Sequence, residues 1–147
     1  MSWLVPSVIA TLTGSVILSL VFFYLYHVHR RDYLGIWSLS WTVYTLRFVL
    51  ILISQADLQT SVLQPLIHLV TLASGFVLLW GTHRFARRRF NPLLLVLGGL
   101  TAGWIVVGTV ARVSFLTMTS PAFLTLGAVY VWTGWTILRT EIGRAHV

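Results

Sequence analysis

The sequence predicts an all-α, polytopic membrane helix bundle with five transmembrane helices. Hydrophobic residues make up 57% of the 147-residue chain and charged residues only 9%, whereas about 25% of the residues of a soluble domain are charged. The mean hydropathy is +0.88. Five apolar runs alternate with short polar connections, and about 20 apolar residues in a helix cross the roughly 30 Å hydrocarbon core of a bilayer. This composition excludes an ordinary soluble domain.

The first predicted span covers residues 3–26. It has no positively charged N-terminal region and no A-x-A-like cleavage site, so we interpret it as a retained helix and not as a signal peptide. Pro6 lies in its first turn, where a missing backbone N–H is tolerated. A short basic connection, residues 27–32, leads to the second span at residues 35–54.

Three further spans are predicted over residues 62–80, 93–113 and 123–138. The pair Ser120-Pro121 predicts a turn before the last of them, because Ser and Pro are frequent turn residues. The second and third spans are joined by a polar connection that contains no basic residue.

Glycines in the last two spans predict close helix packing. Gly99 and Gly103 form a G-x-x-x-G in the fourth span, which allows two helix backbones to approach closely. We favour packing within the chain at this motif, with a homodimer as the alternative. Gly127 and Gly134 predict another close contact in the fifth span.

The arginines predict the orientation. The connections after the first and third spans are rich in Arg, whereas those after the second and fourth spans carry only Arg112. By the positive-inside rule the N-terminus lies outside and the end of the fifth span lies in the cytoplasm. The residues expected to set this topology and contact lipid phosphate are Arg30, Arg31, Arg84, Arg87, Arg88 and Arg89.

The formal net charge of +7 does not indicate nucleic-acid binding, because the arginines lie in short clusters between apolar runs. We expect the lipid bilayer as a partner, no nucleic acid, and a multi-pass location in a bacterial inner (cytoplasmic) membrane. The absence of cysteine excludes disulfides and thiolate metal sites. His27 and His29 do not face each other on a helix, so we predict no metal site and no cofactor.

The second span contains the candidate site. On a helix, Trp37, Trp41 and Tyr44 share one stripe, and Arg47 lies beside its continuation at Phe48. An Arg at the centre of a membrane helix costs roughly 2.5–3.5 kcal/mol on insertion scales, so it normally faces protein or water. The position of Arg47 within the span therefore indicates that this residue has a function.

Two interpretations of Arg47 remain open. It lines a cationic pocket for an anionic or carbonyl ligand, with aromatic walls and with His68 and Asp57 as polar neighbours. Alternatively, it hydrogen-bonds to a backbone carbonyl or to His68 across helices, and the aromatic stripe is plain packing. The candidate ligand-binding residues are Arg47, Trp37, Trp41, Tyr44 and His68.

A family resemblance rests on two runs of the sequence, YLYHVHRRDYLGIWSLSWTVYTLRFVL and LLWGTHRFARRRF. They resemble the N-terminal multi-helix membrane region of bacterial sensor histidine kinases and the related diguanylate cyclases. In that region a basic connection leads into a helix with paired Trp and a following Arg, and a later helix ends in Gly-Thr and a basic segment. The resemblance covers residues 22–90. The matching residues are Tyr26, Arg30, Arg31, Tyr33, Leu34, Trp37, Trp41, Tyr44, Arg47, Gly81, Thr82, Phe85 and Arg88.

The resemblance implies that residues 1–140 are the sensor domain of a bacterial signal-transduction protein. A histidine kinase of a two-component system is the favoured parent protein, and a diguanylate cyclase is the other. An unknown small ligand or membrane stimulus would be its input. No catalytic motif is found, so no enzymatic activity is predicted for this fragment. The alternatives are a structural membrane anchor and a small transporter or channel. A transporter would need several intramembrane polar groups along one path, and only Arg47 and His68 qualify.

Residues 141–147 are expected to be a non-native scar. The sequence EIGRAHV is encoded by GAG ATC GGA AGA GCA CAC GTC, and from Ile142 onward this is the start of a widely used short-read sequencing adapter. We therefore expect the natural chain to continue past Thr140 and leave the last residues out of functional reasoning.

Overall fold

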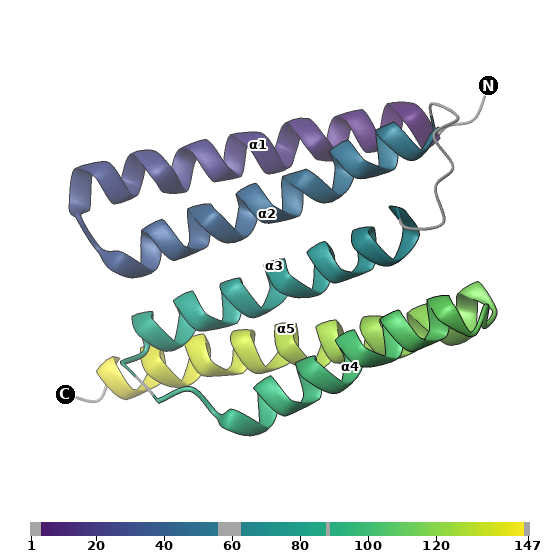
Figure 1. Cartoon of the computed structure of the whole chain (residues 1–147). Coiled ribbons are helices and arrows are strands. Elements are labelled where there is room, and N and C mark those ends of the chain that lie inside the picture. Colours follow the sequence, from purple (N-terminus) through teal and green to yellow (C-terminus); the bar gives the residue numbers. More distant parts are fainter. Residues whose placement is uncertain (1–3, 56–62, 88, 146–147) are drawn as a thin grey trace.

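A computed structural model describes residues 4–55, 63–87 and 89–145 (Figure 1). In these ranges the chain is helical apart from short connections and contains no strand. Each of the five helices is long and apolar enough to cross a membrane, which confirms the all-α class and the five spans by length and composition. The helices are α1 (Leu4–His29), α2 (Asp32–Gln55), α3 (Leu63–Phe85), α4 (Pro92–Val110) and α5 (Phe115–Ala145).

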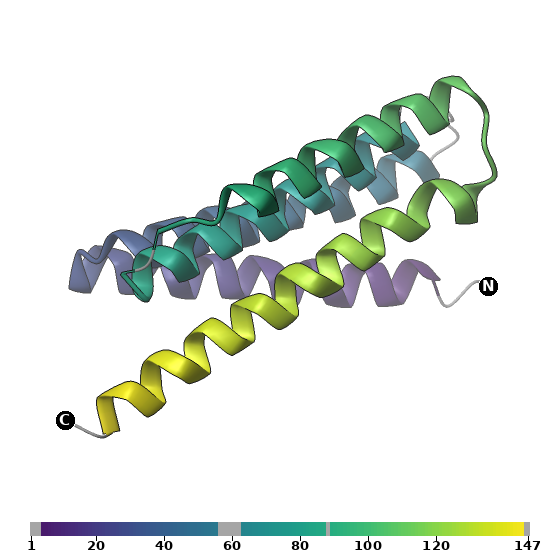
Figure 2. The same ribbon diagram turned by 90° about the horizontal axis from the view of Figure 1, so that it is seen from below.

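The helices run up and down, and α3 lies at the centre of the bundle. It packs against α2, α4 and α5, whereas α1 packs against α2. Figure 1 shows the connections that follow α1 and α3 at the end of the bundle where the C-terminus also lies. Figure 2 shows α5 crossing the other helices obliquely. We call the end with the α1–α2 and α3–α4 connections the basic end, because both connections carry arginines.

The outer faces of the bundle are apolar, and small polar side chains lie between the helices. Leu20, Leu93 and Val110 are 61%, 71% and 81% exposed, whereas Ser40 and Ser74 are buried. In water such faces would form large apolar patches, which soluble monomers rarely expose. This distribution of side chains suits a lipid environment.

Hydroxyl side chains join neighbouring helices. The side chains of Ser19 and Thr42 are hydrogen-bonded at 2.7 Å, and Ser40 Oγ donates to the carbonyl of Ser74 at 2.8 Å. Between α4 and α5, the hydroxyl of Thr101 is hydrogen-bonded to another threonine hydroxyl at 2.8 Å. Such contacts between membrane helices contribute about 0.6 kcal/mol each, so they define the packing more than they stabilise it.

Three arginines end helices in the left-handed backbone conformation. They are Arg30 after α1 with φ 50°, Arg87 after α3 with φ 53°, and Arg112 after α4 with φ 52°. Glycine is the usual residue at this position, since an L side chain there costs roughly 1–2 kcal/mol. The backbone at each helix terminus thereby holds the arginine at an end of the bundle. Arg30 and Arg87 lie at the basic end and Arg112 lies at the other end.

The end of α4 differs from the prediction. The backbone N–H of Arg112 donates to the carbonyl of Thr109 at 3.2 Å, and that of Val113 donates to the carbonyl of Gly108 at 3.0 Å. These two bonds form a helix-terminating Schellman motif. The helix therefore ends at Val110, three residues before the predicted end of the fourth span.

The predicted turn at Ser120-Pro121 is wrong, because α5 begins at Phe115 and contains Pro121. A proline inside a helix leaves the carbonyl four residues earlier without its N–H donor. Here that carbonyl belongs to Thr117, and Trp104 Nε1 of α4 donates to it at 3.1 Å. A side chain of a neighbouring helix thus replaces the missing backbone donor.

Trp104→Phe is expected to reduce the free energy of unfolding by about 1 kcal/mol, since it removes the donor to a carbonyl in an apolar environment. Reversible unfolding in mixed detergent measures this effect. In a Pro121→Ala background the backbone N–H is restored, so the same Trp104→Phe change should cost much less. Equal costs in the two backgrounds would show that the Trp104 bond does not replace the proline's missing donor.

The glycines that pack closely are not those that the motif predicted. A Cβ added to Gly99, Gly103, Gly127 or Gly134 would meet no atom within 4 Å in the described part of the chain. The expected contacts within the chain at these four glycines are therefore wrong. A Cβ added to Gly98, next to the motif, would lie 2.5 Å from the Phe76 ring. The close approach thus falls on the neighbouring face of α4.

Candidate functional site

A cavity of about 410 Å³ lies between α2, α3 and α5, and we call it the central cavity. Trp41 and Tyr44 of α2 and Tyr130 of α5 give it flat aromatic walls, and the bond between Ser40 and Ser74 joins α2 to α3 at its edge. A volume of this size falls within the range of small-molecule sites. The lining residues are Ser40, Trp41, Tyr44, Ser74, Leu78 and Tyr130.

Arg47 lies half-buried one turn beyond Tyr44 on α2. Its Nη1 donates to the Tyr44 hydroxyl at 3.3 Å. The central carbon of the guanidinium lies 5.6 Å from the centre of the Tyr44 ring and 5.5 Å from that of Phe48. Cation–π contacts at these distances stabilise a desolvated guanidinium.

The guanidinium of Arg47 keeps unused hydrogen-bonding capacity. Its Nε is buried and has no hydrogen-bond partner among residues 4–55, 63–87 and 89–145. Leaving a buried charged donor unpaired is costly, and the hydrogen bond to Tyr44 uses only one of the five N–H groups of an arginine. The local geometry therefore leaves a cation able to accept a further partner.

Two polar side chains on other helices lie within electrostatic reach of Arg47. They are His68 on α3 and Tyr130 on α5. Asp57, the other predicted neighbour, lies outside the described residues. The tertiary structure thus brings Tyr44 of α2 and Tyr130 of α5 to one cavity, and Arg47 is hydrogen-bonded to Tyr44.

The predicted aromatic stripe divides into two groups. Trp41, Tyr44 and Phe48 form a run of edge-to-face contacts, with ring centres 5.8 and 5.1 Å apart. Trp37 lies about 15 Å from Arg47 along the helix axis, at 1.5 Å per residue, and does not line the central cavity. Of the five predicted ligand-binding residues, Trp41 and Tyr44 line the central cavity, whereas Trp37, Arg47 and His68 are not among its lining residues.

Trp37 belongs to an aromatic cluster near the basic end. Its ring centre lies 5.5 Å from that of Phe22, 5.3 Å from that of Tyr33 and 5.8 Å from that of Phe85. A Cβ added to Gly81 would lie 2.5 Å from the Trp37 ring. This cluster joins α1, α2 and α3. It contains four of the residues that carried the family resemblance, namely Tyr33, Trp37, Gly81 and Phe85.

Sequence reasoning missed Tyr130, Ser40 and Ser74 as cavity residues. Each is a polar group within a predicted membrane span, but serine and tyrosine are common in membrane helices and do not identify a cavity. Of the six predicted lipid-contacting arginines, Arg88 lies outside the described residues and the others lie at the basic end.

Residues that could hold a metal are sparse in the described ranges, where no group of three His, Asp or Glu side chains gathers. His83 is buried, with Nδ1 3.0 Å from the carbonyl of Leu79 and its ring centre 5.0 Å from that of Phe90. This histidine packs inside the bundle.

No protein-family model, curated protein or solved structure matches the chain.

Proposed function

We propose that the chain is the membrane-embedded input module of a bacterial signalling protein and that the central cavity binds a small ligand with an anionic or carbonyl group. The observation that carries this proposal is the half-buried guanidinium of Arg47, whose Nε lacks a partner in the described part of the chain. Its Nη1 donates to Tyr44, which forms one wall of the cavity of about 410 Å³. Arginine's planar fork of donors suits carboxylate and carbonyl oxygens.

The sensor resemblance supports the same function. Its basic connections, paired Trp and following Arg all occur in this chain, and we propose a histidine kinase as the parent protein. The positive-inside rule places the basic end in the cytoplasm of a bacterial cell and the N-terminus outside. With this orientation the last helix, α5, leads from the cavity to the cytoplasmic side.

Signalling through this cavity requires two packings of the helices. A ligand shifts their populations only as far as its affinities for the two packings differ, and a tenfold difference corresponds to about 1.4 kcal/mol. The cavity is lined by α2, α3 and α5. A ligand that contacts Tyr44 and Tyr130 together would favour the packing in which α5 lies close to α2, and α5 would carry that change to the basic end.

The test is a thermal-unfolding screen of the purified chain in detergent with small carboxylates, phosphates and quinones. At least one compound is expected to raise the Tm, and Arg47→Gln should remove that increase. Arg112→Gln, which removes an arginine from the connection between α4 and α5, should leave the increase in Tm unchanged. A compound that stabilises the wild type and Arg47→Gln equally would place binding away from Arg47, and solute flux through reconstituted vesicles would favour a transporter.

A further inference from the structure

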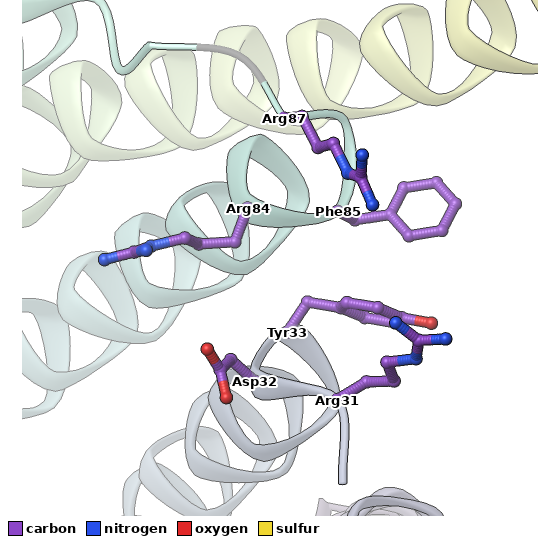
Figure 3. Close-up of a pocket in the computed structure, with 6 residues that line it drawn as sticks. All are labelled: Arg31, Asp32, Tyr33, Arg84, Phe85 and Arg87. Carbon is purple, nitrogen blue, oxygen red and sulfur yellow. The ribbon is translucent and has the colours of Figure 1, made fainter. Parts of the chain in front are cut away.

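A second cavity, also of about 410 Å³, lies at the basic end and is separate from the central cavity. It is formed by the first turn of α2 and the last turn of α3 with the residues that follow it. Tyr33, the lining residue furthest along α2, is about 20 Å from Arg47 along the axis of that helix, at 1.5 Å per residue. The lining residues are Arg31, Asp32, Tyr33, Arg84, Phe85 and Arg87 (Figure 3).

We propose that this basic-end cavity is a specific site for the phosphate headgroup of one anionic membrane lipid. Figure 3 shows the guanidinium groups of Arg31 and Arg87 extending to the same side of the cavity, where the ring of Tyr33 also lies. Two forks of donors on one side can each bind phosphate oxygens in a bidentate manner. The inference does not depend on whether Arg47 contacts a ligand.

The charges of the lining residues favour an anion. Three arginines line the cavity, and Asp32 is the one carboxylate among the lining residues. In Figure 3 the guanidinium of Arg84 points to the side opposite those of Arg31 and Arg87. Asp32 is the first residue of α2, where a negative charge interacts favourably with the positive end of the helix dipole. Its charge is therefore engaged by its own helix, and the arginines keep a net attraction for phosphate.

A lipid fits this position better than a free solute. The cavity lies where two membrane-spanning helices end, which is the depth of lipid headgroups. The Tyr33 and Phe85 rings, 5.1 Å apart, offer an apolar edge to an acyl chain, and the guanidinium of Arg84 lies 6.0 Å from the Trp80 ring, an arrangement typical of a membrane interface. Basic pockets between membrane helices bind anionic headgroups in this way.

The backbone supplies a matched pair of variants. Arg87 and Arg112 both occupy left-handed positions after a helix, with φ 53° and 52°, and glycine adopts this conformation without strain. Arg87→Gly therefore removes a guanidinium from the cavity without opposing the local fold. Arg112→Gly removes the same charge in the same backbone setting at the other end of the bundle.

The experiment measures the affinity of phosphatidylglycerol and of cardiolipin for the purified chain in zwitterionic nanodiscs, by native mass spectrometry of bound lipid. Wild type and Arg112→Gly are expected to retain one anionic lipid. Arg87→Gly and Arg31→Gln should each bind it about tenfold more weakly, with unchanged helicity by circular dichroism.

Three outcomes would overturn the proposal. Equal lipid retention by Arg87→Gly and the wild type would show that the cavity does not hold the headgroup. An equal loss in Arg112→Gly would show a diffuse effect of net charge. Displacement of the lipid by millimolar inorganic phosphate would identify a free phosphate as the ligand in place of a lipid.

Discussion

Arg47→Leu is expected to raise the free energy of unfolding by about 1–2 kcal/mol and to abolish ligand binding in the central cavity. The wild-type guanidinium is half-buried with an unpartnered Nε in the described chain, and a buried unsatisfied donor costs roughly 1–3 kcal/mol. Leucine fits an apolar helix at no such cost. A residue that destabilises its own fold is typical of binding sites.

The measurement is reversible unfolding of the wild type and the variant in the same mixed detergent. The alternative role of Arg47, as a structural link between helices, predicts the opposite sign. If the free energy of unfolding of Arg47→Leu were lower than that of the wild type by 1 kcal/mol or more, the result would favour the structural role. Arg47→Lys serves as the control, because it keeps the charge and loses the planar fork that contacts Tyr44 at 3.3 Å.

Gly81→Ala is expected to reduce the free energy of unfolding by about 1–3 kcal/mol, the usual cost of overpacking. Its Cβ would lie 2.5 Å from Trp37 Cδ1 and 2.8 Å from Trp37 Nε1. The Trp37 ring is held by contacts with Phe22, Tyr33 and Phe85, so it cannot move without disturbing the cluster that joins α1, α2 and α3.

Gly99→Ala is the matched control for Gly81→Ala. A Cβ at Gly99 would meet no described atom within 4 Å, so the free energy of unfolding should stay unchanged or rise by up to about 1 kcal/mol through the helix propensity of alanine. If the two variants were equally stable, the contact between Gly81 and Trp37 would not support the packing of α2 on α3.

The sequence predicts the number and type of the helices well, because long apolar runs depend little on tertiary context. Features that depend on a second helix were predicted poorly. Pro121 lies inside α5, and Trp104, a residue of α4, donates to the carbonyl of Thr117 that the proline leaves without its backbone donor. Nothing within residues 115–125 alone indicates that partner.

The candidate site shows the same limit. Arg47, Trp41 and Tyr44 could be grouped because helical spacing within one span determines their common face. Tyr130 could not be added, since only the packing of α5 brings it to the cavity. Trp37 shares the stripe but lies too far along α2, where Gly81 provides space for its ring. A small-residue motif such as that at Gly99 likewise does not reveal which face of its helix meets a neighbour.

The most direct test of the proposed signalling function is long-read sequencing of the source gene across the codon for Thr140. The proposal predicts that the reading frame leads from these helices into a cytoplasmic histidine kinase or cyclase domain. A stop codon directly after Val147 would contradict the proposal and would favour a self-contained five-helix transporter or membrane anchor.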